Sequence, residues 1–209
     1  MTELGKVEKP AVENFKGRRK LYCVPNIYIV KDAPEDYKEL AHKYWGEATA
    51  QAEKLEAAGK IKKIFCESVH VQGDDALKTL SEINEQTARL IKKKIAEGAE
   101  LFPVENPEIF GPFLDWANCL NVVRTQEVFS KILEFYTEFS NKRLTHIMGV
   151  INTNLADGEA GMLIMRDEDR VKLQFPADIE IFLVTPPSYD DILKWFRKKM
   201  KDMQSNPAE

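Results

Sequence analysis

Short β-branched segments alternate with long helical segments through the first half of the chain. Three segments rich in β-branched and aromatic residues are typical of strands, and they span residues 20–30, 61–71 and 99–105. The segments between them, 32–59 and 74–98, repeat apolar residues at helical spacing and end at Gly59 and Gly98. The order strand, helix, strand, helix, strand is typical of right-handed crossovers. This half therefore predicts a parallel sheet with helices packed on it.

The second half of the chain begins with predicted helices. A short apolar helix is predicted from Pro112, and a longer apolar stripe at helical spacing runs from Gln126 to about residue 155. A break near Ser140 would divide this stripe into two helices. The sequence is compatible with one long helix and with two.

Strands and a last helix follow. Residues 160–165 and 170–174 flank the polar stretch RDED and predict a β-hairpin. Residues 178–184 form a nearly continuous apolar run, typical of a strand buried on both faces, and residues 189–200 predict a final helix. The predicted fold class is α/β. It has a layered sheet, a parallel β-α-β-α-β N-terminal part with helices packed on it, and a C-terminal α+β part with a hairpin and a final helix.

The chain is predicted to form two lobes, residues 17–105 and 106–203, that share one core. No linker rich in Pro, Gly or Ser separates them. Residues 1–16 are polar and lack periodicity, so a mobile tail is expected there, and residues 204–209 are expected to fray.

Composition limits the location and the partners. The 209 residues carry a net charge of −4, which disfavours adhesion of the whole protein to nucleic acid or anionic lipid. No apolar run approaches the roughly 18 residues that span a bilayer, and the N-terminal residues have no signal-peptide pattern. Cys23, Cys66 and Cys119 lie among apolar neighbours, as buried free thiols do. We expect a cytoplasmic protein without membrane contact.

The sequence lacks the motifs that hold cofactors or metals. It has 10 glycines and neither GxGxxG nor GxxxxGK[ST], so a dinucleotide or P-loop site is not expected. CxxC does not occur, and His42, His70 and His146 form no HxH or HExxH pair. Neither a bound cofactor nor a bound metal is therefore expected.

Two candidate catalytic residues lie near the end of a predicted strand. Glu67 and His70 belong to the stretch CESVH, close to the carboxyl edge where open α/β sheets place ligands. Cys66 and His70 are four residues apart, roughly 13 Å along an extended strand, so they cannot form a nucleophilic pair. A structural role for His70 is the alternative.

Two further candidates come from the second half of the chain. Asp115 lies in an apolar helix, where a buried carboxylate would need a partner such as Arg124 or Arg143. Glu159 lies in a glycine-flanked loop, and loops carry functional residues more often than cores do. An ordinary turn and a structural carboxylate are the alternatives.

Positive charge concentrates near both ends of the chain, in KGRRK (16–20) and KWFRKKMK (194–201). If these segments lie close together, they form one cationic patch that could hold RNA phosphates and stack a base on an aromatic ring. The candidate nucleic-acid contacts are Arg18, Arg19, Lys194, Arg197 and Lys198. The alternative is a set of solvated charges on a packed helix.

Several stretches resemble known proteins. Residues 37–61, 113–120 and 175–192 resemble an uncharacterised bacterial family. The layout around GEAGMLIM and DIEIFLV is similar to that of bacterial relatives of archaeal and eukaryotic peptide-chain release factors. That resemblance implies contact with RNA or the ribosome. The peptide-releasing GGQ tripeptide is absent, so peptidyl-tRNA hydrolysis is not implied.

Three functional hypotheses follow. The first is a protein that acts by binding or regulation as a homo-oligomer, because the aromatic helical stripes exceed what one small core needs and no catalytic constellation emerges. The second is a small-molecule enzyme with a crevice near His70. The third is an RNA- or ribosome-associated protein that uses the terminal basic segments.

Overall fold

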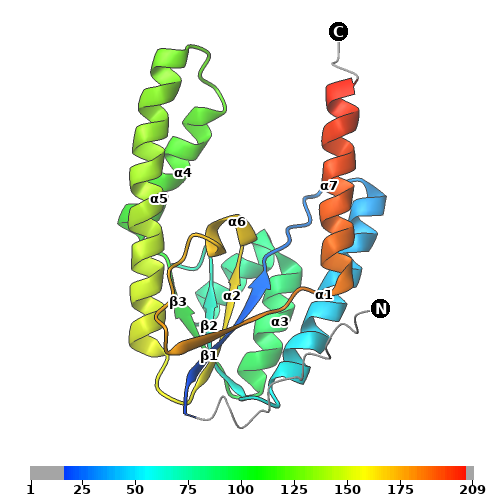
Figure 1. The fold of residues 1–209 in the computed structure, drawn as a ribbon, viewed down its shortest axis with the longest axis vertical. Coiled ribbons are helices and arrows are strands. Elements are labelled where there is room, and N and C mark those ends of the chain that lie inside the picture. The colour runs from blue at the N-terminus through cyan, green and yellow to red at the C-terminus, as the bar shows by residue number, and fades with distance from the viewer. Residues whose placement is uncertain (1–16, 206–209) are drawn as a thin grey trace, which may run out of the picture.

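The computed structural model describes residues 17–205 and folds them around one five-stranded sheet (Figure 1). Every strand pairing is parallel, which confirms the predicted α/β class. The strands are β1 (Arg19–Pro25), β2 (Ile61–Cys66), β3 (Glu100–Pro103), β4 (Ala160–Met165) and β5 (Ile179–Leu183). The predicted tail at 1–16 and residues 206–209 of the predicted C-terminal tail lie outside the described residues.

The strand order in the sheet is β3-β2-β4-β1-β5. β4 comes from the second half of the chain, yet it lies between β1 and β2 from the first half. The prediction of a hairpin between residues 160–165 and 170–174 is wrong: β4 pairs with β1 and β2, and residues 170–174 do not join the sheet. Every residue of β4 is buried. This is expected for a central strand, because neighbouring strands cover both of its edges and helices cover both of its faces.

Helices cover both faces of the sheet (Figure 1). They are α1 (Glu35–Leu55), α2 (Gly73–Ile83), α3 (Glu85–Ala96), α4 (Pro107–Leu120), α5 (Gln126–Asn154), α6 (Asp167–Arg170) and α7 (Pro187–Ser205). Side chains of α1, α2, α3 and α7 build the core on one face, and the C-terminal half of α5 builds the core on the other. The alternation of side chains along β1 explains the two cores, because Tyr22 and Val24 enter the first while Leu21 and Cys23 enter the second.

The predicted helix over residues 74–98 is divided at Asn84, which has an extended backbone between α2 and α3. The Asn84 side chain accepts a hydrogen bond from the backbone N–H of Thr87 and so caps α3. Its amide also donates to Asn26 Oδ1 at 3.0 Å and to the Ile27 carbonyl at 2.9 Å. These hydrogen bonds connect the break between α2 and α3 to the segment that follows β1. They are tertiary contacts, so helical periodicity in the sequence does not predict the break.

The long stripe from residue 126 forms one unbroken helix, α5. Its N-terminal half packs against α4, and the two project beyond the sheet as a helical arm, residues 107–139 (Figure 1). Six large apolar side chains of the arm are exposed: Leu114, Val122, Val128, Phe129, Leu133 and Phe135. The aromatic stripe noted in the sequence is therefore only partly used by the core.

The close packing around Gly161 in β4 yields a stability prediction. A Cβ at this position would lie 3.1 Å from the Phe65 ring and 3.2 Å from Leu155 Cδ1. We expect Gly161→Val to lower the free energy of unfolding by about 1–3 kcal/mol in denaturant titrations, because the added methyl groups overpack the core. The control is Gly149→Val, since a Cβ on Gly149 in α5 would meet nothing within 4 Å. Equal effects of the two substitutions would contradict the packing described here.

Candidate functional site

Polar residues follow four of the five strands at the carboxyl edge of the sheet. Asn26 follows β1, Glu67 follows β2, Glu105 comes two residues after β3, and Arg166 follows β4. Asn26, Glu67 and Glu105 are buried. Open α/β sheets bind ligands beyond the carboxyl ends of their strands, so this edge is the candidate site.

Arg143 of α5 links the buried carboxylates at this edge. Its Nε donates to both carboxylate oxygens of Glu105, at 3.0 and 2.9 Å, and its Nη2 donates to Glu105 at 2.6 Å. Its Nη1 donates to Asp169 at 2.9 Å, and Glu67 Oε2 lies 3.7 Å from Nη2. The guanidinium also lies over the rings of Phe110 and Phe113 in α4, which shield it from solvent.

Glu67 joins this ionic cluster to the loop that follows β1. Glu67 Oε1 accepts hydrogen bonds from Asn26 at 2.9 Å, from the Tyr28 hydroxyl at 3.0 Å and from the backbone N–H of Arg166 at 3.1 Å. The Arg166 guanidinium lies 3.7 Å from Glu67 Oε2. One buried carboxylate thus positions residues from the chain after β1 and after β4.

The buried charges differ in how they titrate. Burial raises the pKa of Glu67, although the charges of Arg166 and Arg143 and the hydrogen bond from Asn26 act in the opposite direction. Burial also opposes ionisation of Asp169, but the hydrogen bond from Lys172 and the charge of Arg143 outweigh it and lower the pKa of Asp169. The two carboxyl groups therefore contribute to stability with opposite pH dependence.

A cavity of about 660 Å³ lies beside the buried cluster, at the carboxyl end of β1. It is lined by the loop of residues 25–34, by Tyr37 of α1, by the segment around α6 and by α7, and most of its surface is apolar. Its volume is within the range of about 300–1,000 Å³ that is typical of small-molecule pockets.

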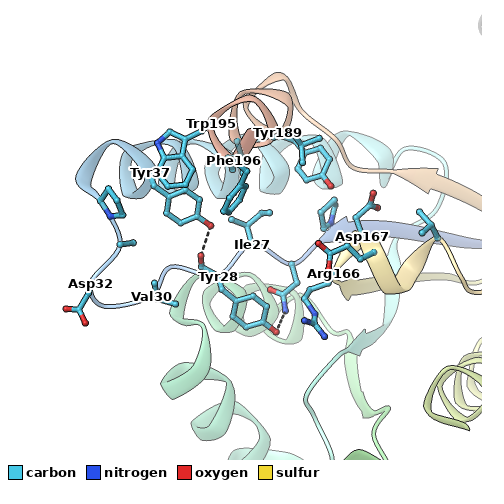
Figure 2. Close-up of a pocket in the computed structure, with 18 residues that line it drawn as sticks. Ile27, Tyr28, Val30, Asp32, Tyr37, Arg166, Asp167, Tyr189, Trp195 and Phe196 are labelled. Carbon is cyan, nitrogen blue, oxygen red and sulfur yellow. Dashed lines mark hydrogen bonds between the residues drawn. The ribbon is translucent and has the colours of Figure 1, made fainter. Parts of the chain in front are cut away.

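Five aromatic side chains line the cavity: Tyr28, Tyr37, Tyr189, Trp195 and Phe196. Figure 2 shows the rings from α1 and α7 on one side of the cavity and Tyr28 with Arg166 on the other. The Tyr37 hydroxyl donates to the Tyr28 carbonyl at 2.8 Å, and Trp195 Nε1 donates to Asp36 at 2.8 Å. Burial and the nearby charge of Asp167 raise the pKa of Tyr189 to about 12, so this hydroxyl stays protonated at neutral pH.

The four candidate catalytic residues do not come together. Glu67 is buried in the cluster next to the cavity wall, whereas His70 is exposed in the loop after β2 and does not line the cavity. Asp115 is exposed on the helical arm, so it does not need the partner that a buried carboxylate would. Glu159 lies before β4, at the opposite edge of the sheet, and its carboxylate accepts the backbone N–H of Ala156.

The two basic segments lie at opposite edges of the sheet and do not form one patch among the described residues. Arg18 pairs with Glu180, and Arg19 pairs with Asp178 and donates to backbone carbonyls, all near the start of β1. The other segment lies on α7, which begins after β5 and runs away from the sheet (Figure 1). Its candidate contacts Lys194, Arg197 and Lys198 are exposed. Lys16 lies outside the described residues.

Asn26, Tyr28, Glu105 and Asp169 are site residues that were not predicted from the sequence, and Arg143 was predicted only as a possible partner of Asp115. One signal in the sequence was a polar residue within or at the end of each predicted strand segment, at Asn26, Glu67 and Glu105. Arg143 gave no such signal, because a single arginine on a long helix is typical of a solvated surface.

The fold and the site define a parallel α/β protein with an aromatic cavity at the carboxyl edge of its sheet. Comparisons with family models, with curated proteins and with solved structures found no match. Within residues 17–205, no three His, Cys, Asp or Glu side chains are grouped so that they could hold a metal ion. No helix in the same range is both long and apolar enough to cross a membrane.

Removing Arg143 is expected to destabilise the fold strongly. Arg143→Met leaves three buried carboxylates without their shared cation, and breaking a buried ion pair from one side typically costs about 3–5 kcal/mol. Denaturant titration of the variant measures this loss. Arg89→Met is the control, because Arg89 is exposed and pairs only with Glu85 on its own helix. A loss for Arg143→Met no larger than for Arg89→Met would contradict the role of Arg143.

The opposite pKa shifts of Glu67 and Asp169 give a second prediction. The raised pKa of Glu67 means that its contribution to stability is complete below its ordinary pKa and is lost as pH rises through the folded pKa. The lowered pKa of Asp169 means that its contribution is present above its ordinary pKa and is lost as pH falls.

Relative to wild type, Glu67→Gln should therefore gain stability as pH rises from about 4 to about 7, and Asp169→Asn should lose stability over the same interval. Free energies of unfolding measured across this interval test both signs. Slopes of the same sign for the two variants would be incompatible with the described electrostatics.

Proposed function

We propose that the protein binds a small organic molecule with an apolar body in the cavity at the carboxyl edge of the sheet. The observation that carries this proposal is the cavity of about 660 Å³ with an aromatic lining, at the position where open α/β sheets hold their ligands. An apolar wall of this kind is the usual lining of a small-molecule pocket, and Phe196 is its exposed ring.

Binding without catalysis fits the site better than an enzymatic reaction does. A reaction needs a titratable group that reaches the substrate. Glu67, the predicted catalytic residue that lies beside the cavity, already accepts hydrogen bonds from Asn26, Tyr28 and the backbone of Arg166. His70 is not part of the cavity wall. The enzyme hypothesis with a crevice near His70 therefore has less support than the binding hypothesis.

A fragment screen tests the proposal. Small aromatic fragments should raise the melting temperature and give saturation-transfer NMR signals, because they cover apolar surface of the cavity. Phe196→Ala should weaken their binding by about tenfold, since it removes one ring of the lining. Phe129→Ala is the matched control, because Phe129 is an exposed ring of the helical arm. No fragment binding, or equal loss in both variants, would refute the proposal.

We also propose that the helical arm mediates self-association. The arm exposes six large apolar side chains on a projecting helical hairpin, and two such hairpins can bury them together in a four-helix arrangement. Acidic and basic residues are interspersed along this part of α5, at Glu127, Lys131, Glu134, Glu138 and Lys142. A second copy in antiparallel orientation would then meet opposite charges rather than a surface of one sign.

Light scattering after size-exclusion chromatography tests self-association. The wild-type protein should elute as a dimer whose population falls on dilution, and Val128→Glu combined with Leu133→Glu should give a monomer, because buried charge would oppose pairing. Met200→Glu is the control, since Met200 is exposed on α7 outside the arm. A wild-type monomer at all concentrations would rule out this second proposal.

A further inference from the structure

We infer that the cavity takes a small organic cation, an amine or quaternary ammonium group carried on an apolar body. The inference rests on the proposed function, that the cavity holds a small molecule, and it names the chemical class of that molecule. It follows from which polar groups of the cavity wall are already used and which are left for a ligand.

The side-chain donors of the wall already have acceptors. The Tyr28 hydroxyl and the Asn26 amide donate to Glu67, and the Tyr37 hydroxyl donates to the Tyr28 carbonyl. Trp195 Nε1 donates to Asp36, and the Tyr189 hydroxyl lies near the negative charge of Asp167. A ligand that needs donors, such as a carboxylate or a phosphate, would have to break bonds that the fold already makes.

Arg166 is the only cationic side chain among the described residues that line the cavity, and this half-exposed side chain lies beside two buried carboxylates. Its guanidinium lies 3.7 Å from Glu67 and donates to Asp169 at 3.4 Å. An anionic ligand that competed for Arg166 would leave Glu67 with one fewer cation in a buried position.

The groups left for a ligand are aromatic faces and carboxylates. Five rings line the cavity, and ring faces attract cations through their negative quadrupole. Lys199 Nζ already lies 5.5 Å from the centre of the Trp195 ring, so Tyr28, Tyr37, Tyr189 and Phe196 are the rings left for a ligand. Asp32 and Glu168 also line it, and within residues 17–205 neither side chain has a hydrogen bond or ion pair. Figure 2 shows Asp32 at the outer rim of the cavity. The two carboxylates and the ring faces together favour a ligand that is a cation and a hydrogen-bond donor.

A matched series of three probes tests the charge of the ligand: 3-phenylpropylamine, 3-phenylpropan-1-ol and 3-phenylpropanoate. Their apolar bodies are the same, so differences in dissociation constant report the head group. Calorimetric titration or NMR titration of the full chain should give the tightest binding for the amine, by about three- to tenfold over the alcohol, and the weakest for the carboxylate.

Charge removal at the rim tests the assigned residues. Asp32→Asn combined with Glu168→Gln should weaken amine binding by about three- to tenfold and leave alcohol binding unchanged, because only the amine is a cation. Asp75→Asn combined with Glu82→Gln removes the same formal charge from exposed positions on α2 and is the matched control. This control should bind the amine as the wild-type protein does.

The outcomes separate this inference from the function on which it rests. If the alcohol or the carboxylate binds as tightly as the amine, and Phe196→Ala weakens that binding, the cavity is a binding site but the cationic class is wrong. An equal loss of amine binding in both charge-removal variants also overturns the cationic class. If none of the three probes binds the wild-type protein, the proposed function fails as well.

Discussion

The ionic bonds of Arg143 hold the carboxyl edge of the sheet together. One guanidinium from α5 binds Glu105 after β3 and Asp169 in α6, and it lies near Glu67 after β2. Each of these carboxylates would be costly to bury alone, since an ionised group in a protein interior needs a partner. Arg143 therefore allows the segments that follow β2, β3 and β4 to carry buried carboxylates, and α4 packs over this cluster.

The same cluster determines the shape of the cavity through a chain of hydrogen bonds. Glu67 fixes the Tyr28 hydroxyl, the Tyr28 carbonyl accepts from Tyr37, and Tyr37 packs against Trp195 and Phe196 of α7. Rings on both sides of the cavity are thus positioned by bonds that end at a buried carboxylate. Such a pre-organised wall lowers the entropy cost of ligand binding, because the side chains are already ordered before a ligand arrives.

The sequence predicted the parts of the structure that depend on local pattern. Strand and helix periodicity located β1, β2, β3, α1 and β5, and the predicted α/β class is confirmed. The predicted hairpin between 160–165 and 170–174 was wrong. Alternating residues in 170–174 do not reveal which strands pair with β4, and β4 instead lies between β1 and β2, where both of its edges are paired. For the site, Glu67 was recognisable from its place near the carboxyl end of a predicted strand. Arg143 was not, since helical spacing does not reveal which charge a fold turns inward.

The balance of charges explains why the cavity is acidic although cations lie beside it. Glu67, Glu105 and Asp169 are matched by Arg143, Arg166 and Lys172, and Asp167 is paired with Arg170. The cluster as a whole is therefore close to neutral, and its field on the cavity largely cancels. Asp32 and Glu168 have no such counter-charge among the described residues, so their negative potential acts on the open side of the aromatic wall. Selectivity for a cation would then come from two exposed carboxylates, while the buried cluster supplies rigidity.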